Sequence, residues 1–197
     1  MASKELTSTV ITYDKWVQEN KKVDEEVIDA YVTAVNVAFH ETPLDLEYAK
    51  NLSAKVKNMI NKFVLKEKNG NIAQLEEYSI LTNTRVNILD QYYECQLHEA
   101  PYIFNSYLNV LERNRQEKDK FYKPRRNCFR KIGIIQALQD LEDGKLDVLS
   151  LSMPPGTGKT TLEKFFISWV IGRDLEGFSL FFSHSGDITR MFYDGIL

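Results

Sequence analysis

A short glycine-rich loop, MPPGTGKTT over residues 153–161, carries the residues best suited to chemistry. Glycine lets a backbone wrap closely around a phosphate group, because no Cβ blocks the approach of the amide N–H donors. Gly156 and Gly158 meet this need, Lys159 is expected to reach the β- and γ-phosphates, and Thr160 is expected to place its hydroxyl on Mg²⁺. The nucleotide-binding candidates of the loop are Pro155, Gly156, Thr157, Gly158, Lys159, Thr160 and Thr161.

This loop departs from the general P-loop pattern at one position. The pattern has glycine five residues before its second glycine, and Met153 stands there. Pro154 and Pro155 stiffen the entry to the loop. A chance match in a surface turn is the alternative explanation, and the core GTGKT does not by itself distinguish an ATPase, a GTPase and a kinase.

In known folds a P-loop typically follows a buried strand and precedes a helix, and the sequence predicts both here. Residues 146–153 (LDVLSLSM) alternate in polarity, which predicts a buried strand, and a helix is predicted from about Lys159 to Gly172 with Trp169 in the core. A second strand is predicted over 178–183, and Asp187 is expected to cap a last helix.

Glycine is scarce before Gly133, where only Gly70 occurs, and this favours helices in the first part of the chain. Apolar residues at helical spacing predict helices over about 23–39, 45–66, 72–97, 102–111 and 127–141. The sequence therefore predicts an α/β chain, with a helical N-terminal region over 1–113 and a nucleotide-binding domain over 114–197.

Residues upstream of the loop are candidates for a base pocket. Gln136 lies 23 residues before Lys159, and in many helicase-like ATPases a glutamine upstream of the loop reads adenine; a solvated helix face is the alternative. Tyr122 or a guanidinium could stack on a base. Arg125 and Arg126 either contact phosphates or stay solvated.

Composition and charge exclude several classes of protein. With 43% hydrophobic and 27% charged residues the chain is unlike a disordered or membrane-embedded protein, and it shows neither an apolar stretch of about 20 residues nor a signal peptide. Its two cysteines indicate a reducing compartment rather than a disulfide scaffold or zinc site. The net charge of −3 does not suggest a polyanion partner, but residues 118–131 carry seven Lys and Arg against Asp119 alone; they either attract phosphates or form a solvated linker.

About half of the chain, from about Pro101 to Leu197, resembles the start of the ATPase domain of tailed-bacteriophage terminase large subunits. Four motifs carry the resemblance in order: Tyr-x-Pro-Arg-Arg at 122–126, Pro-Pro before the loop, Trp-x-x-Gly-Arg at 169–173 and His-Ser at 184–185. Residues 1–100 cannot be matched to the family motif by motif.

This resemblance implies the beginning of a P-loop ATPase domain of the RecA/ASCE type, with an incomplete sheet. It implies a motor that uses ATP and Mg²⁺ to move double-stranded DNA into a capsid. Its implied partners are the small terminase subunit and the portal protein, in a homo-oligomeric ring when full length, without a membrane. The implied location is the cytoplasm of a bacterial host, with a phage or prophage as the source.

By position, the resemblance assigns phosphate to Lys159, Mg²⁺ to Thr160 and adenine to Gln136. His184 and Ser185 follow the second predicted strand, where helicase-like motors touch nucleic acid. The alternative for these two residues is a helix-entry turn, capped by Ser185 or Asp187.

Several family features are missing from the sequence. Many members carry an arginine inside the phosphate loop, but none lies in 153–161, so that role falls to Arg125, Arg126 or a neighbouring subunit. The acidic pair that would hold Mg²⁺ and activate water is expected beyond Leu197, so the catalytic residues are unknown. We expect a truncated N-terminal fragment with weak or no turnover. The alternatives are a P-loop kinase and a non-catalytic module that binds the small terminase subunit or the portal.

Overall fold

The computed structural model describes residues 10–11, 15, 25–41, 46–68, 86–174, 176–177, 180, 182–183 and 185–194. It divides the chain into two compact units, Met1–Glu99 and Ala100–Leu197. The sequence places its boundary between residues 113 and 114, whereas the structure includes α6 (Phe104–Glu112) in the second unit. The residues from about Pro101 onward, which carry the four motifs noted in the sequence, lie within this second unit.

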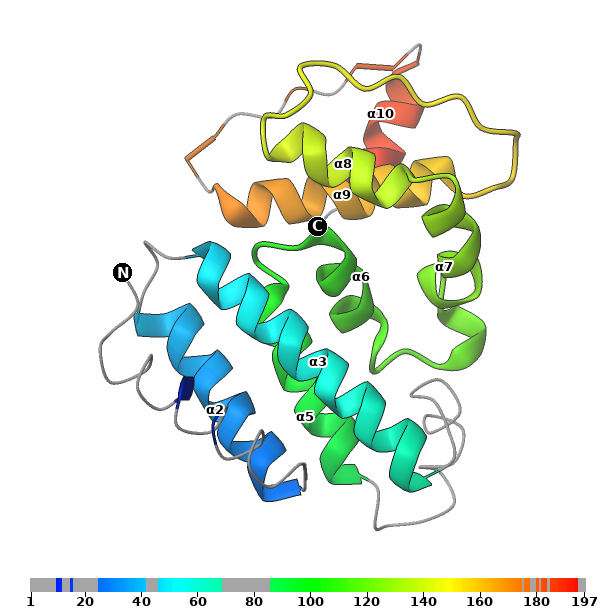
Figure 1. Ribbon diagram of the computed structural model, residues 1–197. Coiled ribbons are helices and arrows are strands. Elements are labelled where there is room, and N and C mark those ends of the chain that lie inside the picture. Colours follow the sequence, from blue (N-terminus) through cyan, green and yellow to red (C-terminus); the bar gives the residue numbers. More distant parts are fainter. Residues whose placement is uncertain are drawn as a thin grey trace. The chain divides into compact units, whose positions relative to one another are not determined.

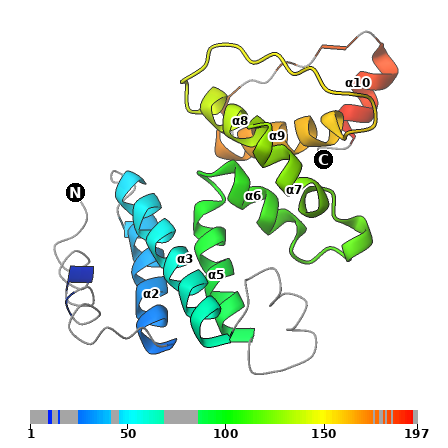
Figure 2. The same ribbon diagram turned by 45° about the vertical axis from the view of Figure 1, so that its right-hand side comes forward.

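In the first unit, three helices pack against one another pairwise: α2 (Glu25–Glu41), α3 (Leu46–Lys68) and α5 (Val86–Glu99). Figures 1 and 2 show them side by side. Apolar residues at helical spacing fill the space between them, including Ile28, Tyr31, Val35, Val56 and Ile60. The helices predicted over 23–39 and 45–66 are confirmed within two residues. The third, predicted over 72–97, is confirmed from Val86, and residues 72–85 lie outside the described part of the chain.

An ion pair joins α3 and α5 inside this bundle. Lys57 Nζ lies 2.5 Å from Glu99 Oε2, and the Glu99 side chain is only 1% exposed. A buried carboxylate without its partner is costly, so the pair favours the register that brings the two residues together. Burial, followed by the charge of Glu99, raises the pKa of the neighbouring Cys95 thiol to about 12, so this thiol stays protonated at neutral pH.

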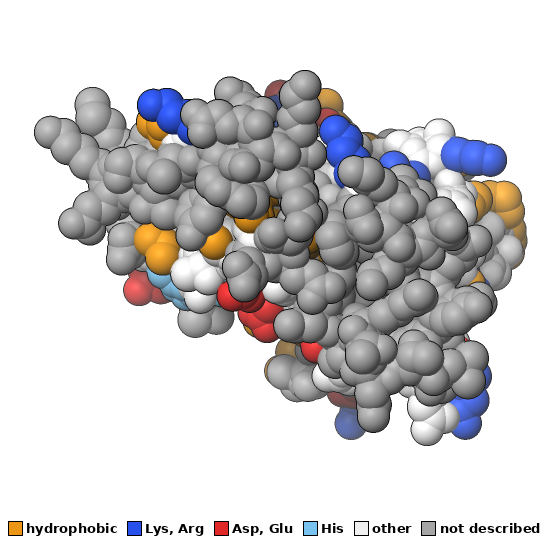
Figure 3. All heavy atoms as spheres, turned by 60° about the horizontal axis from the view of Figure 1, so that its bottom comes forward, with side chains coloured by type: hydrophobic (Ala, Val, Ile, Leu, Met, Phe, Trp, Pro, Cys, Tyr) orange, Lys and Arg blue, Asp and Glu red, His pale blue; other side chains and the backbone are white. Residues whose placement is uncertain are grey.

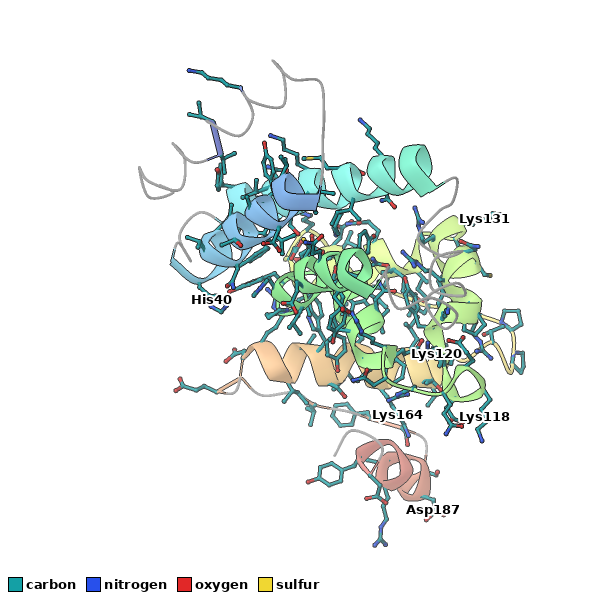
Figure 4. The ribbon with its side chains drawn as sticks, turned by 90° about the horizontal axis from the view of Figure 1, so that it is seen from below. His40, Lys118, Lys120, Lys131, Lys164 and Asp187 are labelled. Carbon is teal, nitrogen blue, oxygen red and sulfur yellow. The ribbon has the colours of Figure 1, made fainter. Side chains whose placement is uncertain are left out.

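His98 of α5 lies against the end of α2. Its ring packs against the rings of Phe39 and His40, and Figure 4 labels His40 at the end of α2. Burial and then His40 lower the pKa of His98, against an opposing effect of Glu94 at 4.0 Å. Figure 3 shows a histidine (pale blue) beside an acidic side chain (red) on the molecular surface.

We expect the first unit to lose stability as the pH falls. The unfolded chain binds the His98 proton more tightly than the folded chain, so the loss begins near the usual histidine pKa of about 6.5 and grows below it. Thermal unfolding followed by circular dichroism at about pH 8 and pH 5.5 measures this loss, and His98→Gln should reduce it. Parallel pH profiles of wild type and variant would contradict the assignment to His98.

In its described part, the second unit contains η2 (Glu117–Asp119) and five helices: α6, α7 (Tyr122–Lys131), α8 (Ile134–Glu142), α9 (Lys159–Arg173) and α10 (Gly186–Tyr193). Within this unit α6 contacts α7, α8 and α9. The core residues are Phe104, Leu108, Tyr122, Phe129, Ile134, Ile135, Leu138, Leu162 and Trp169. Trp169 is 2% exposed, so its predicted place in the core is confirmed.

Side chains of neighbouring helices cap two helix starts in this unit, those of α6 and α7. Glu112 at the end of α6 accepts hydrogen bonds from three backbone N–H groups at the start of α7: those of Phe121 (2.6 Å), Tyr122 (2.6 Å) and Lys123 (3.0 Å). Pro124 follows and has no N–H to satisfy. Gln139 of α8 likewise accepts from Phe104 N at 2.8 Å, at the start of α6. A side chain on another helix therefore supplies the cap in each case, because neither helix has a capping side chain of its own.

A single helix over 127–141 is wrong. The structure has two helices there, α7 and α8, separated at Gly133. Gly133 has a φ of +74°, in the left-handed region that glycine adopts without a Cβ penalty. α7 also begins earlier than predicted, at Tyr122, because Pro124 is tolerated in the first turn of a helix.

The predicted α/β fold class is contradicted. Where the structure describes the chain, it is helical and irregular and contains neither a strand nor a sheet. Residues 146–153, predicted as a buried strand, form an irregular segment. In the range of the second predicted strand, residues 180, 182 and 183 are irregular too, and 178, 179 and 181 lie outside the described residues.

The alternation over 146–153 has another origin. Leu149, Leu151 and Met153 pack against the helical core, the serines between them are exposed, and Val148 just before them is 81% exposed. Contact with helices thus produces the two-residue period without a hydrogen-bonded neighbour. A strand needs such a neighbour, because its N–H and C=O groups pair across a sheet. The alternation therefore reflects contact of three side chains with the helical core, and the predicted strand is wrong.

Candidate phosphate-binding loop

The loop before α9 contains two glycines in the left-handed region. Gly156 and Gly158 both have positive φ values, +76° and +93°, and a side chain would strain the backbone at either position. The Thr157 hydroxyl donates to the Pro154 carbonyl at 2.9 Å and closes the turn. Gly158 is the N-cap of α9 and offers no capping side chain, so the first N–H groups of the helix have no side-chain partner from this residue.

Phe121 packs against the loop at its second glycine. A Cβ built on Gly158 would lie 2.6 Å from Cζ of Phe121, closer than real Cβ atoms approach. The same ring meets Phe165 of α9 edge-on, with centroids 5.7 Å apart, and lies 6.0 Å from the ring of Phe129 of α7. Phe121 therefore links the start of α7 to the loop and to α9.

The structure places the predicted phosphate and Mg²⁺ residues together at the start of α9. Lys159 and Thr160 are its first two residues and Thr161 its third; Lys159 is half-buried and Thr160 exposed. Among the residues that the structure describes, no carboxylate forms an ion pair with Lys159. The lysine thus adds its positive charge to the positive end of the helix dipole. Pro155 is exposed at the entry of the loop.

Arg125 lies on the same aromatic ring as the loop. Its guanidinium carbon is 4.7 Å from the centroid of Phe121, and its Nη1 donates to the Phe121 carbonyl at 3.0 Å. In the described part of the chain no carboxylate pairs with Arg125. Arg126, the other arginine predicted near the phosphates, is half-buried, and its Nε is enclosed without a hydrogen-bond partner.

The predicted base pocket is not assembled. Tyr122 is fully buried: its hydroxyl donates to Asn105 Oδ1 at 2.5 Å and its ring stacks near Phe129. No face of Tyr122 is open to a base, so this structure does not allow the stacking role. Gln136 is exposed on α8 and donates to Asp140 at 3.0 Å, one turn along the same helix.

Of the predicted DNA contacts, His184 lies outside the described residues. Ser185 forms a helix-entry turn before α10: its carbonyl accepts from the Ser183 hydroxyl at 2.7 Å and from Thr189 N at 3.2 Å. The alternative interpretation of Ser185 as part of such a turn matches these bonds.

The basic segment 118–131 runs from η2 to the end of α7. Figure 4 shows Lys118 and Lys120 before α7 and Lys131 at its end. Glu117, just outside the segment, pairs with Lys120 at 2.6 Å and Lys123 at 3.2 Å. These ion pairs lower the pKa of the Glu117 carboxyl. Part of the positive charge is thereby neutralised locally.

Comparisons of the chain with protein-family models, with curated proteins and with solved structures found no match. Within the described residues, no group of three or more His, Cys, Asp or Glu side chains could hold a metal ion, and no helix is long and apolar enough to cross a membrane. Function is therefore inferred from the loop and its neighbours.

Two residues that matter for this site carry no motif. Phe121 is one of many aromatic residues in the sequence, and its contact with Gly158 depends on how α7 and α9 pack. Glu112 is one acid in a polar stretch, and its capping role needs α6 and α7 to meet. The signal available in the sequence for either is its position near the Tyr-x-Pro-Arg-Arg box.

Proposed function

We propose that residues 153–161 bind the phosphate groups of ATP together with Mg²⁺. The observation that carries the proposal is the pair of left-handed glycines at the start of α9, beside a lysine without a carboxylate partner among the described residues. Such a loop offers backbone N–H groups and a cation to an anion. The contacts invoked need the loop and the helix alone, and no sheet.

On the resemblance of residues 101–197, we further propose that the chain is the ATP-binding part of a phage terminase large subunit. Its partners would then be double-stranded DNA, the small terminase subunit and the portal protein, in the cytoplasm of a bacterial host. The phosphate end of ATP fits the residues present better than the base does. Tyr122 is buried and Gln136 is bonded to Asp140, so base selectivity should be low.

Isothermal titration of the full chain with ATP and Mg²⁺ tests the phosphate site. We expect Lys159→Ala to weaken binding by at least about tenfold, because it removes a charge-assisted contact to phosphate. Lys131→Ala is the matched control: it removes the same charge from an exposed position at the end of α7 and should leave the affinity nearly unchanged. Equal affinities of Lys159→Ala and wild type would overturn the proposal.

A second candidate is a non-catalytic interaction module that binds the small terminase subunit or the portal. Three apolar residues of the second unit are largely exposed to solvent: Val148 (81%), Leu180 (80%) and Phe182 (82%). Exposed apolar residues are typical of binding surfaces when they are contiguous. An absence of ATP binding in both wild type and Lys159→Ala would favour this candidate over the first.

A further inference from the structure

We propose that Arg125, held in place by the ring of Phe121, is a second cation of the phosphate site and gives it a preference for a triphosphate over a diphosphate. The inference rests on the proposed function, because it concerns the same loop. It assigns Phe121 as a positioning residue, a role that no motif predicts.

The first step is that one ring touches both the loop and the guanidinium. A Cβ built on Gly158 would clash with the Phe121 ring, and Arg125 stacks on that ring with its guanidinium carbon 4.7 Å from the centroid. Because both groups meet a single ring, that ring sets the position of the guanidinium relative to the loop. Its Nη1 bond to the Phe121 carbonyl, at 3.0 Å, fixes the side chain further.

The second step concerns charge. Arg125 is without a carboxylate partner among the described residues, and so is Lys159. A guanidinium that stacks on an aromatic ring keeps its in-plane N–H donors available for an anion. The loop N–H groups and Lys159 can neutralise one phosphate group, and each further group in the chain adds negative charge. A second cation on one side of the loop would therefore matter more for ATP than for ADP.

The structure also distinguishes the two candidate arginines. Arg126 has an enclosed Nε, and its charge acts on the buried Tyr122. It has no contact with Phe121 among those found in the described residues. A second ring–arginine pair extends the same arrangement, since Arg115 lies 5.5 Å from the centroid of Phe165, the ring that meets Phe121 edge-on.

The test is the ratio of the affinities of the full chain for Mg-ATP and Mg-ADP, measured by titration calorimetry. For wild type we expect ATP to bind about tenfold more tightly than ADP, which is the effect of one charge-assisted phosphate contact. Arg125→Gln should bring the ratio close to one. Arg130→Gln removes the same charge from an exposed site on the same helix and should keep the wild-type ratio.

Variants of Phe121 test the positioning role. Phe121→Leu keeps an apolar side chain but removes the ring, so it should lower the ratio as Arg125→Gln does, whereas Phe121→Tyr should retain it. A purely structural role would change both affinities alike and leave the ratio unmoved. If Phe121→Leu does not fold, as judged by circular dichroism, the comparison of Arg125→Gln with Arg130→Gln decides.

The outcomes separate this inference from the proposed function. A wild-type ratio in Arg125→Gln, together with lost binding in Lys159→Ala, overturns the role of Arg125 and leaves the phosphate site standing. If Arg125→Gln and Arg130→Gln lower the affinities for Mg-ATP and Mg-ADP by the same factor, the effect is due to the loss of one positive charge at either position. That result also overturns the role of Arg125. A wild type that binds neither nucleotide overturns both proposals.

Discussion

Replacing Glu112 by alanine should destabilise the second unit by about 4 kcal/mol, the largest effect that we expect from a single side chain in this protein. Glu112 is 3% exposed and its two carboxylate oxygens accept from three consecutive backbone N–H groups. Without the carboxylate, these donors lose their partners at a buried helix end. Glu112→Gln should cost less, about 1–2 kcal/mol, because it retains one acceptor oxygen.

Glu117→Ala is the matched control for Glu112→Ala. Glu117 lies close by in the sequence, but its side chain is 69% exposed and it contributes two surface ion pairs, to Lys120 and Lys123. Such pairs contribute at most about 1 kcal/mol. Hydrogen exchange of the amides of Tyr122 and Lys123 reports the loss directly. Equal protection of these amides in the two variants would contradict the capping role.

The second large effect is expected at Gly158. Gly158→Ala should weaken ATP binding at least about tenfold and lower the stability of the second unit by about 2–4 kcal/mol. A Cβ there would lie 2.6 Å from Cζ of Phe121, at a φ of +93° that L-residues seldom adopt. Either the Phe121 ring or the backbone must therefore move, and both are part of the site.

Gly172→Ala tests the same substitution at the other end of α9. Gly172 is exposed within the helix, has no atom within 4 Å of a built Cβ and has no positive φ. Alanine there should stabilise the protein by up to about 1 kcal/mol, because glycine is a poor helix former. Adding Phe121→Ala to Gly158→Ala should recover the part of the stability lost to the clash with the ring. The part lost because alanine must adopt a positive φ should remain. Urea unfolding measures both; indistinguishable midpoints for Gly158→Ala and Gly172→Ala would refute the steric explanation.

Helices could be predicted from the sequence wherever apolar spacing was regular. The stripes through Val27, Ile28 and Tyr31 and through Leu52, Val56 and Ile60 predicted α2 and α3 almost to their ends. The spacing of apolar residues did not reveal the boundary between α7 and α8. Ile132 and Ile135 continue the helical spacing across Gly133, so one helix was predicted where there are two. The sequence shows a glycine at position 133, but it does not show that this glycine adopts the left-handed conformation that separates the two helices.

The candidate site was predictable in its local part only. The order of glycines and Lys159 predicted a loop followed by a helix, and both are present because they depend on neighbouring residues. The base pocket depended on how distant helices pack, and there the prediction for Tyr122 failed: its ring fills the core and Asn105 binds its hydroxyl. Phe121 and Glu112 were missed for the same reason.

The exchange of caps between α6, α7 and α8 has a consequence for how the second unit is made. As a separate peptide, α7 would begin with backbone N–H groups that have no acceptor, next to cations that repel one another. A separate α6 would lack the Gln139 side chain that accepts from its first N–H group. Neither helix contains the side chain that caps its own first turn, so we expect neither to form by itself. Assembly of this unit should thus be concerted, with partners 9 to 35 residues apart meeting before any one turn persists.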